Sequence, residues 1–293
     1  MKSLSIKIIG SFIFLISGAL MAQDFQGKAY YQSKTSMDMS NFAGQQMSEQ
    51  QRKMMAERMK SMLEKTFVLS FNRTESIYKE EEKLAAPGAG GGGRMGGMMG
   101  SFTAGAQYKN VKDQQLVQDQ EFFGKQFLVK DSIPKLEWKM GTESKQIGQY
   151  LCFKATAVKK GDDLDFANMR RRNRDDEQKD SEKSKDTAKS TNLMDEIEVP
   201  KEILVTAWYT PQIPVNQGPG EYWGLPGLIL EVNSGNTTIL CSKIEINPTD
   251  KTEIKAPSRG KVVTKKEYDD IVKDKMKEMQ EMYGGRGGGG SRR

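Results

Sequence analysis

Two groups of side chains in this sequence combine residue types and spacing that could support chemistry. The first is Met55, Met59 and Met62, which recur at helical spacing among charged residues. Thioether sulfur is a soft ligand that selects Cu(I), so these methionines would suit a copper-handling protein. The same spacing suits methionines that pack as an adaptable apolar face of a helix. No histidine or cysteine lies nearby, which favours packing, and a copper titration separates the two interpretations.

The second group is aromatic. Trp208, Tyr209, Tyr222 and Trp223 form two adjacent pairs on either side of a Gly/Pro-rich connection. Rings in such positions commonly fill one face of a sheet, and this is the favoured interpretation. The alternative is an apolar cleft on a curved sheet that receives a lipid-like group or a peptide segment.

Catalytic constellations are poorly supported. The chain contains no histidine, which removes the usual Ser-His-Asp and Cys-His arrangements and every zinc site that needs histidine. Carboxylates such as Glu137, Glu221 and Glu231 are candidate acids or bases for hydrolysis, but no spacing selects two of them. We therefore expect a non-catalytic protein without a cofactor.

The second aromatic pair is followed directly by Gly224, Leu225, Pro226 and Gly227. In the four residues from Leu225 to Leu228, proline at the second place and glycine at the third predict a type II turn, because proline presets φ and glycine accepts a positive φ. The apolar run 228–230 then predicts a buried strand. These residues are expected to shape the fold and not to react.

Strand signals dominate the remainder of the chain. Apolar and polar residues alternate with the period of a β-strand in several segments. These segments are 24–34, 67–72, 147–158, 203–210 and 237–246. Few helices intervene, and 233–236 has the composition of a hairpin turn, so the strands should be mostly antiparallel.

Two segments have helical patterns. One spans about 47–63, and the other follows Thr264 and Glu267, which form a capping-box pattern before an apolar stripe. The predicted fold class is mainly β: a curved, largely antiparallel sheet, half-barrel or sandwich-like, with one or two packing α-helices.

The N-terminus predicts export. Residues 1–22 combine lysines, an apolar run shorter than a membrane span and small residues before a cleavage point. Removing Lys2 and Lys7 with this signal peptide lowers the formal charge from +6 to +4, which gives no reason to expect nucleic-acid binding. No membrane span is expected after cleavage, so the predicted location is the periplasm or cell envelope.

The mature chain is predicted to be one β-rich domain over 23–283. Glycine dominates 86–105, which predicts a flexible loop, and mixed charge dominates 159–193, which predicts a disordered insertion. The Gly/Arg-rich end, 284–293, is predicted to be a flexible tail.

Export raises the question of a disulfide between Cys152 and Cys241, which would add ~3–5 kcal/mol of stability. If the strands between them pair in chain order, the two cysteine strands are three steps apart. Neighbouring strands are ~4.8 Å apart, so the Cα atoms would be ~14 Å apart, beyond the reach of a disulfide. The sequence therefore favours two free thiols.

Two blocks, "IGQYLCFKATA" and "TAWYTPQIPVNQGPGEYWGLPGLILEV", together with the capped terminal helix, resemble the GLPGLI family of exported Bacteroidota proteins. Gln149 stands where the family motif has glycine, and the charged insertion departs from most members. The resemblance implies a cell-envelope protein with no established activity, and, for some members, an association with TonB-dependent outer-membrane receptors. We therefore expect a binding or interaction protein with such an envelope partner, with methionine-based copper handling as the alternative.

Overall fold

The computed structural model describes eight stretches of the chain. They are residues 25–36, 48–50, 53–54, 63–81, 102–162, 170–171, 197–198 and 201–284. Several predictions fall outside them: the signal peptide 1–22, the tail from 285, and the methionines Met55, Met59 and Met62.

Twelve strands form one open sheet with the order β14-β6-β5-β4-β3-β2-β1-β13-β12-β11-β8-β7. Along the sequence, the first six of these strands are β1 (Gly27–Thr35), β2 (Glu64–Phe71), β3 (Glu75–Glu80), β4 (Phe102–Asn110), β5 (Gln115–Phe122) and β6 (Lys125–Ser132). The other six are β7 (Lys139–Ile147), β8 (Tyr150–Lys160), β11 (Glu202–Thr210), β12 (Leu228–Ser234), β13 (Thr237–Ile246) and β14 (Lys261–Val263). A separate two-stranded ladder joins β9 (Arg170–Arg171) and β10 (Ile197–Glu198).

All pairs in the large sheet are antiparallel except β14 with β6, which are parallel. Most strands pair with their neighbours in the sequence, as expected for strands joined by short turns. The predicted fold class is confirmed: the protein is mostly β, with one large, open, mixed sheet.

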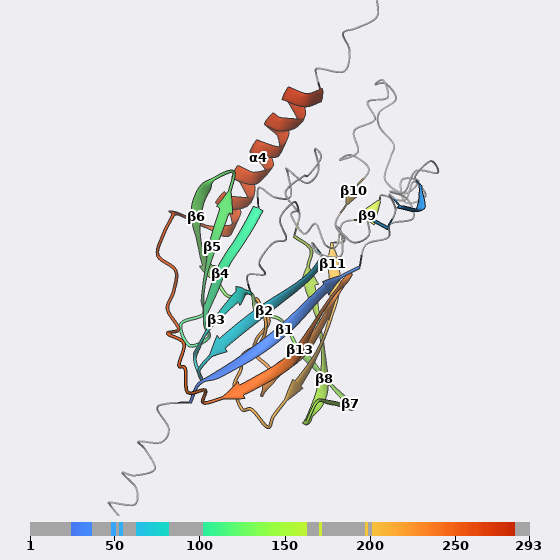
Figure 1. Cartoon of the computed structure of the whole chain (residues 1–293), viewed down its shortest axis with the longest axis vertical. Coiled ribbons are helices and arrows are strands. Elements are labelled where there is room, and N and C mark those ends of the chain that lie inside the picture. Colours follow the sequence, from blue (N-terminus) through green and yellow to red (C-terminus); the bar gives the residue numbers. More distant parts are fainter. Residues whose placement is uncertain are drawn as a thin grey trace, which may run out of the picture.

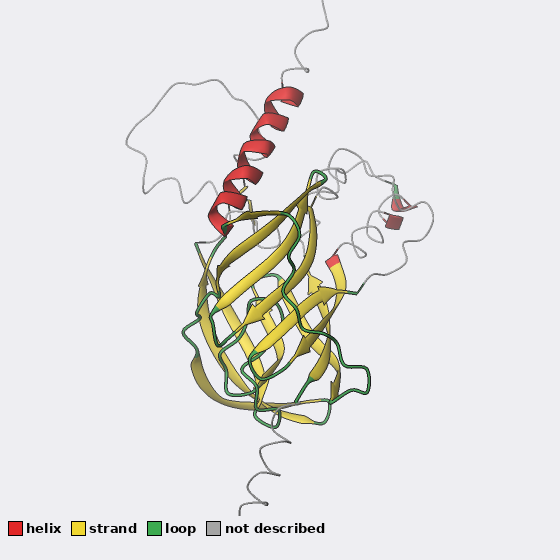
Figure 2. Ribbon diagram, turned by 90° about the vertical axis from the view of Figure 1, so that its left-hand side faces the viewer, coloured by secondary structure: helices red, strands yellow, loops and turns green. Residues whose placement is uncertain are grey.

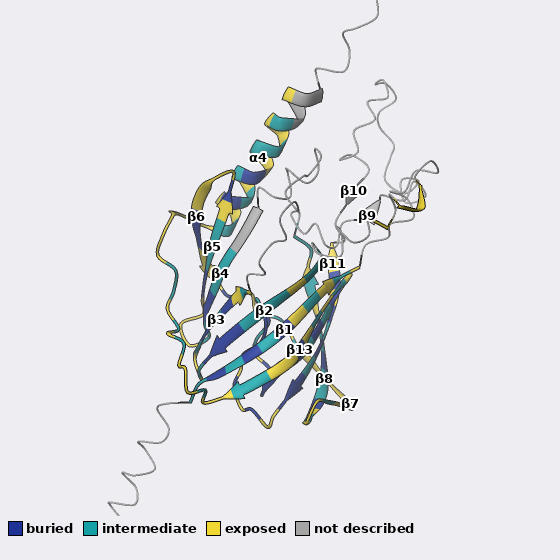
Figure 3. Ribbon diagram, viewed as in Figure 1, coloured by how far each residue is buried: buried dark blue, intermediate teal, exposed yellow. Residues whose placement is uncertain are grey.

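The sheet curls strongly (Figures 1 and 2). In the strand order, β3 and β8 are six steps apart, which is about 29 Å in a flat sheet at ~4.8 Å per step. One buried cluster nevertheless contains Tyr78 of β3 and Cys152 of β8, together with Leu228 and Leu230 of β12. The middle strands therefore pack against strands near the β7 edge, and the core lies between them (Figure 3).

One described helix, α4 (Lys265–Gly284), begins where the capping box predicts. Glu267 accepts a hydrogen bond from the Thr264 backbone N–H at 2.7 Å, and the Glu267 N–H donates to Thr264 Oγ1 at 3.2 Å. Tyr268 and Val272 then pack on the aromatic and aliphatic side chains of β5, β6 and β14. The helix extends beyond the sheet (Figure 1). Nowhere in the described ranges does a helix have the length and apolarity of a membrane span.

Three boundary predictions need correction. The segment 147–158 is not one strand, because Gly148 and Gln149 form a turn between β7 and β8, with a positive φ of 59° at Gly148. Leu151 is 48% exposed and does not join the buried face. Strand β4 begins at Phe102 and β8 extends to Lys160, so the predicted flexible segments 86–105 and 159–193 each overlap a strand.

The hairpin predicted at 233–236 is confirmed. Strands β12 and β13 pair up to Ser234 and Thr237, and two turn residues connect them. Gly235 takes a φ of 56° at the first turn position, a position where glycine is favoured in two-residue hairpins.

Candidate functional site

The segment that contains GLPGLI lies in the core. Leu225, Leu228, Ile229 and Leu230 are each at most 1% exposed. Leu228 and Leu230 join the cluster that links β12 to the middle of the sheet, whereas Leu225 and Ile229 join a second cluster with β8 and β11. These four side chains therefore pack in the core, whereas Gly224 and Pro226 are exposed.

The turn before β12 differs from the predicted type II turn. The N–H of Gly227 donates to the carbonyl of Leu225 at 2.8 Å, which is the short bond of a three-residue turn centred on Pro226. The N–H of Leu228, which a type II turn would direct back to Leu225, donates instead to Ile213 O at 2.9 Å. The tertiary contact with Ile213 overrides the local turn preference.

Glycine is nevertheless required at position 227. Its φ of 159° lies at the limit of the positive range that other residues rarely adopt. A Cβ atom placed there would lie 2.2 Å from the carbonyl oxygen of Thr210, closer than any real contact. The close approach of two backbone segments is the main reason for this glycine. Gly224, at φ 90°, is the residue of this turn that does occupy left-handed space.

The connection from β11 to β12 surrounds a buried lysine. Lys109 of β4 is 1% exposed, and its Nζ donates to three main-chain carbonyls of the connection. These are Gly218 O at 3.0 Å, Gly220 O at 3.1 Å and Tyr222 O at 2.9 Å. Burial lowers the pKa of Lys109 to about 7, and the negative charge of Glu221 opposes this shift. Three acceptors match the three N–H groups of one ammonium.

Further polar contacts attach the same connection to the sheet. Ser76 of β3 donates to Gln217 Oε1 at 2.9 Å, and both residues are buried. Lys159 of β8 forms an ion pair with Glu221, with 2.5 Å between Nζ and Oε1. The connection is thus held from β3 and β4 on one side and from β8 on the other. The sequence does not predict the burial of Lys109, because a lysine in an alternating strand is expected to face solvent.

The four aromatic residues do not line one cleft. Tyr209 and Tyr222 are 8% and 7% exposed and pack in the cluster with Leu225. Trp208, the neighbour of Tyr209 in β11, faces the opposite side of the strand, where Lys145 Nζ lies 4.3 Å from its ring centroid. Trp208 is also partly buried against the cluster that contains Cys152, so three of the four rings pack against the core.

Trp223 stands apart from the buried pair. Its Nε1 donates to Pro134 O at 2.8 Å, and its own carbonyl accepts a 2.8 Å hydrogen bond from Trp138 Nε1. These bonds tie the connection to the segment before β7. They give Trp223 a role in packing the loop.

The three candidate carboxylates have different surroundings. Glu221 pairs with Lys159, and Glu231 pairs with Lys145 at 2.6 Å. Glu137 is exposed. Within the described part of the chain, no group of three or more His, Cys, Asp or Glu side chains is arranged to hold a metal ion.

Both cysteines are free and buried. The strand order β8-β11-β12-β13 puts their strands three steps apart, as predicted. Burial raises the pKa of Cys152 to about 11 and that of Cys241 to about 12. Since the thiolate is the reactive form, these thiols are inert near neutral pH.

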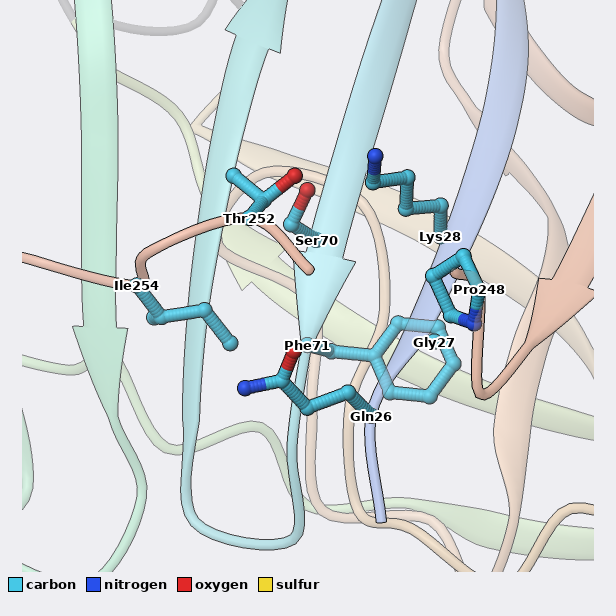
Figure 4. Close-up of a pocket in the computed structure, with 8 residues that line it drawn as sticks. All are labelled: Gln26, Gly27, Lys28, Ser70, Phe71, Pro248, Thr252 and Ile254. Carbon is cyan, nitrogen blue, oxygen red and sulfur yellow. The ribbon is translucent and has the colours of Figure 1, made fainter. Parts of the chain in front are cut away.

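A shallow hollow lies elsewhere on the described part of the chain (Figure 4). It is found where the ends of β1 and β2 meet the segment after β13. The Phe71 ring packs over Gly27 there, so that a Cβ atom on Gly27 would lie 2.3 Å from the ring. This is a packing contact and not a ligand-sized cavity.

Two exposed apolar side chains lie side by side near the β7 edge of the sheet. Val158 of β8 and Leu204 of β11 are cross-strand partners and are 56% and 64% exposed. Met140 of β7 and Leu151 of β8 are also exposed, but the register places them on the opposite face of these strands. Large apolar residues that protrude together mark surfaces that meet other molecules. The alternation along β11 indicates this exposure in the sequence, because Leu204 points to the opposite face of the strand from the buried Ile203 and Val205.

A family model described as "Protein of unknown function (Porph_ging)" matches residues 138–231. This is the GLPGLI-type family that the sequence resembles, and the match covers less than half of the chain. It runs from the start of β7 into β12, so it contains both the buried connection and the exposed edge. No curated protein matches the chain.

Two solved structures of PNGF-II, in the C2 and P21 space groups, align with 85% of this chain at TM-scores of 0.45 and 0.44. Their sequence identities are 12% and 14%, and the chain spans about a third of their length, 32% and 33%. Values this low carry no inference about function.

Proposed function

We propose that this chain is an exported, non-catalytic binding protein of the cell envelope, and that its partner is another envelope protein. The N-terminal pattern of residues 1–22 supports export, and the GLPGLI resemblance supports a TonB-dependent receptor as the kind of partner. Neither the carboxylates nor the thiols described above form a reactive group, which favours binding over catalysis.

The observation that carries the proposal is the combination of a filled interior and an apolar edge. The connection from β11 to β12, residues 211–227, is called the motif connection. It occupies the space inside the curl, and Lys109 Nζ donates hydrogen bonds to three of its carbonyls. A partner therefore binds on the outside. Val158 and Leu204 present adjacent exposed apolar side chains there.

We expect the partner to contact exposed side chains and not to pair with the backbone of β7 as an added strand. Strand β7 is the end of the sheet, but its pairing with β8 shifts between Met140 and Ser144. Bulges and charges of this kind protect an edge from adding another strand. Glu143 in this bulge also pairs with Lys154 at 2.7 Å. The exposed face beside the edge is thus the better docking surface.

The proposal is tested by crosslinking in intact cells followed by purification of the tagged protein. The variant Val158→Lys with Leu204→Lys should lose the crosslinked envelope partner, because a lysine pair cannot bury against an apolar surface. Val262→Lys is the matched control, since Val262 is 60% exposed on β14 at the opposite edge. Equal recovery of the partner with both variants would reject this surface, and recovery of no partner with the unmodified protein would reject the function.

A further inference from the structure

An extended segment, residues 247–260, connects β13 to β14 and is called the strap. It belongs to no strand or helix, and it runs along the outside of the sheet (Figure 1). Two of its side chains, Ile254 and Ala256, pack on buried side chains of β4, β5 and β6. The strap joins strands that are seven steps apart in the strand order, which is about 34 Å at ~4.8 Å per step. Residues 261–284, which comprise β14 and α4 and are called the arm, therefore dock far from the point where the strap leaves β13.

The arm docks on the edge of the sheet through one short ladder and one apolar cluster. Strand β14 pairs with β6 over three residues, in parallel, and parallel pairing is slightly less stable than antiparallel pairing. From α4, Tyr268 and Val272 are buried, and Ile271 and Met276 are partly buried. The helix then extends beyond the sheet (Figure 1). This attachment is small beside that of a central strand such as β1, which is paired on both sides.

An ion pair at the base of the arm adds little to this attachment. Lys265 Nζ lies 2.7 Å from Asp162 Oδ2 and 2.6 Å from Asp269 Oδ1. The side chains of Lys265 and Asp162 are 40% and 33% exposed, and ion pairs with such exposure contribute little to stability. We therefore expect the arm to detach without unfolding of the sheet, as weakly attached units do in other proteins.

A detached arm leaves an edge that matches it in shape and chemistry. Phe122, Phe127 and Val129 are at most 4% exposed beneath β14 and α4. Without β14, one row of N–H and C=O groups on β6 loses its strand partner, and an edge of this kind binds an added strand. The arm of a second copy offers the same strand and the same helix face, so a second copy is the partner that fits this edge.

We propose that the arm exchanges between copies of this chain: the arm of one copy docks on β6 of another, and the reverse. Each contact of the exchanged arm is one that the single chain already makes, so exchange is a low-cost route to a dimer. The strap keeps a chain's own arm at a millimolar effective concentration, and single copies therefore prevail in dilute solution. Strand β6 and the strands that carry Val158 and Leu204 lie near opposite ends of the strand order. The exchange therefore leaves the proposed partner surface free.

Shortening the strap tests the exchange. Fully extended, residues 247–260 reach about 46 Å at ~3.3 Å per residue. Deleting residues 249–253 lowers this reach to about 30 Å, less than the ~34 Å to the docking site. The arm then reaches only a second copy, so light scattering should show a dimer at micromolar concentration. Replacing residues 249–253 with a Gly/Ser segment of the same length is the control and should leave a monomer. A monomeric deletion variant overturns the proposal.

Two further changes identify the contact in that dimer. Gly260 has a φ of 108°, and a Cβ atom there would lie 2.9 Å from the main chain of Gln126 in β6. Gly260→Ala should therefore return the deletion variant to a monomer, because its arm no longer fits β6. An excess of a synthetic peptide of residues 258–284 should do the same by occupying β6. A dimer that withstands either change forms through another surface and overturns arm exchange.

Amide hydrogen exchange of the unmodified mature protein tests detachment independently. The α4 amides of Val272 and Met276 should exchange at least about tenfold faster than the β1 amides, and with a smaller dependence on urea, because detachment exposes less surface than global unfolding. Equal rates with equal urea dependence would show that the arm leaves only when the sheet unfolds. That result also overturns the proposal.

Discussion

At the scale of single residues, Lys109 makes the most specific prediction. Its pKa is about 7 in the fold, against an ordinary value of 10.5. Between these two values the unfolded chain binds the proton and the folded chain does not, so the free energy of unfolding rises with pH. Below about pH 7 both states are protonated and the contribution is constant.

The measurement is the free energy of unfolding of the wild type minus that of Lys109→Met, from urea titrations at several pH values. We expect the difference to rise by up to about 1.4 kcal/mol per pH unit between pH 7 and 10. Lys109→Met should be less stable than the wild type at every pH, because it leaves three carbonyls unsatisfied. A difference independent of pH would show that the three carbonyls keep the lysine protonated.

Gly227 makes a second prediction at this scale. Gly227→Ala places a Cβ atom against the Thr210 carbonyl and should lower the free energy of unfolding by about 3 kcal/mol through overpacking. Gly124→Ala is the control. Gly124 has a φ of 71° but open space around its Cβ position, so the cost there is about 1 kcal/mol of backbone strain. Equal costs would show that the backbones at Gly227 separate easily.

At the scale of elements, the capping box at the start of α4 makes a third prediction about stability. Thr264→Ala removes the hydroxyl that accepts from the Glu267 N–H, and should lower the free energy of unfolding by about 1 kcal/mol. Ser258→Ala, at an exposed position before β14, should change it by less than about 0.5 kcal/mol. Thermal unfolding of both variants checks this. An unchanged midpoint for Thr264→Ala would mean that α4 unfolds independently of the sheet.

The elements also show where sequence patterns succeed. Alternation predicted the strands that contain Leu69, Val205 and Ile239, because a half-buried strand imposes a period of two. It missed the turn at Gly148, since the apolar residues on either side continue the pattern across it. The type II turn at Pro226 was wrong because a distant carbonyl, that of Ile213, takes the N–H that the local turn would use.

At the scale of the whole molecule, the curl of the sheet brings together residues whose proximity cannot be predicted from the sequence. Lys109 and Gln217 are far apart in the chain and polar, so neither stands out as a core residue until β4 and the β11–β12 connection are brought together. The exposure of Leu204 likewise depends on which face is left uncovered. The buried strand at 228–230 was predictable from its apolar residues, whereas its partners in space were not.

The central claim is that the motif connection fills the interior and leaves binding to the outer surface. Amide hydrogen exchange of the free protein tests this most directly at the N–H groups of Leu228 and Ile229, which donate to Ile213 O and Gln217 O. We predict that both exchange only through global unfolding, with protection equal to that of the strand β1 amides. Fast exchange of both amides under native conditions, while β1 stays protected, would show that the connection opens as a unit and would contradict the claim.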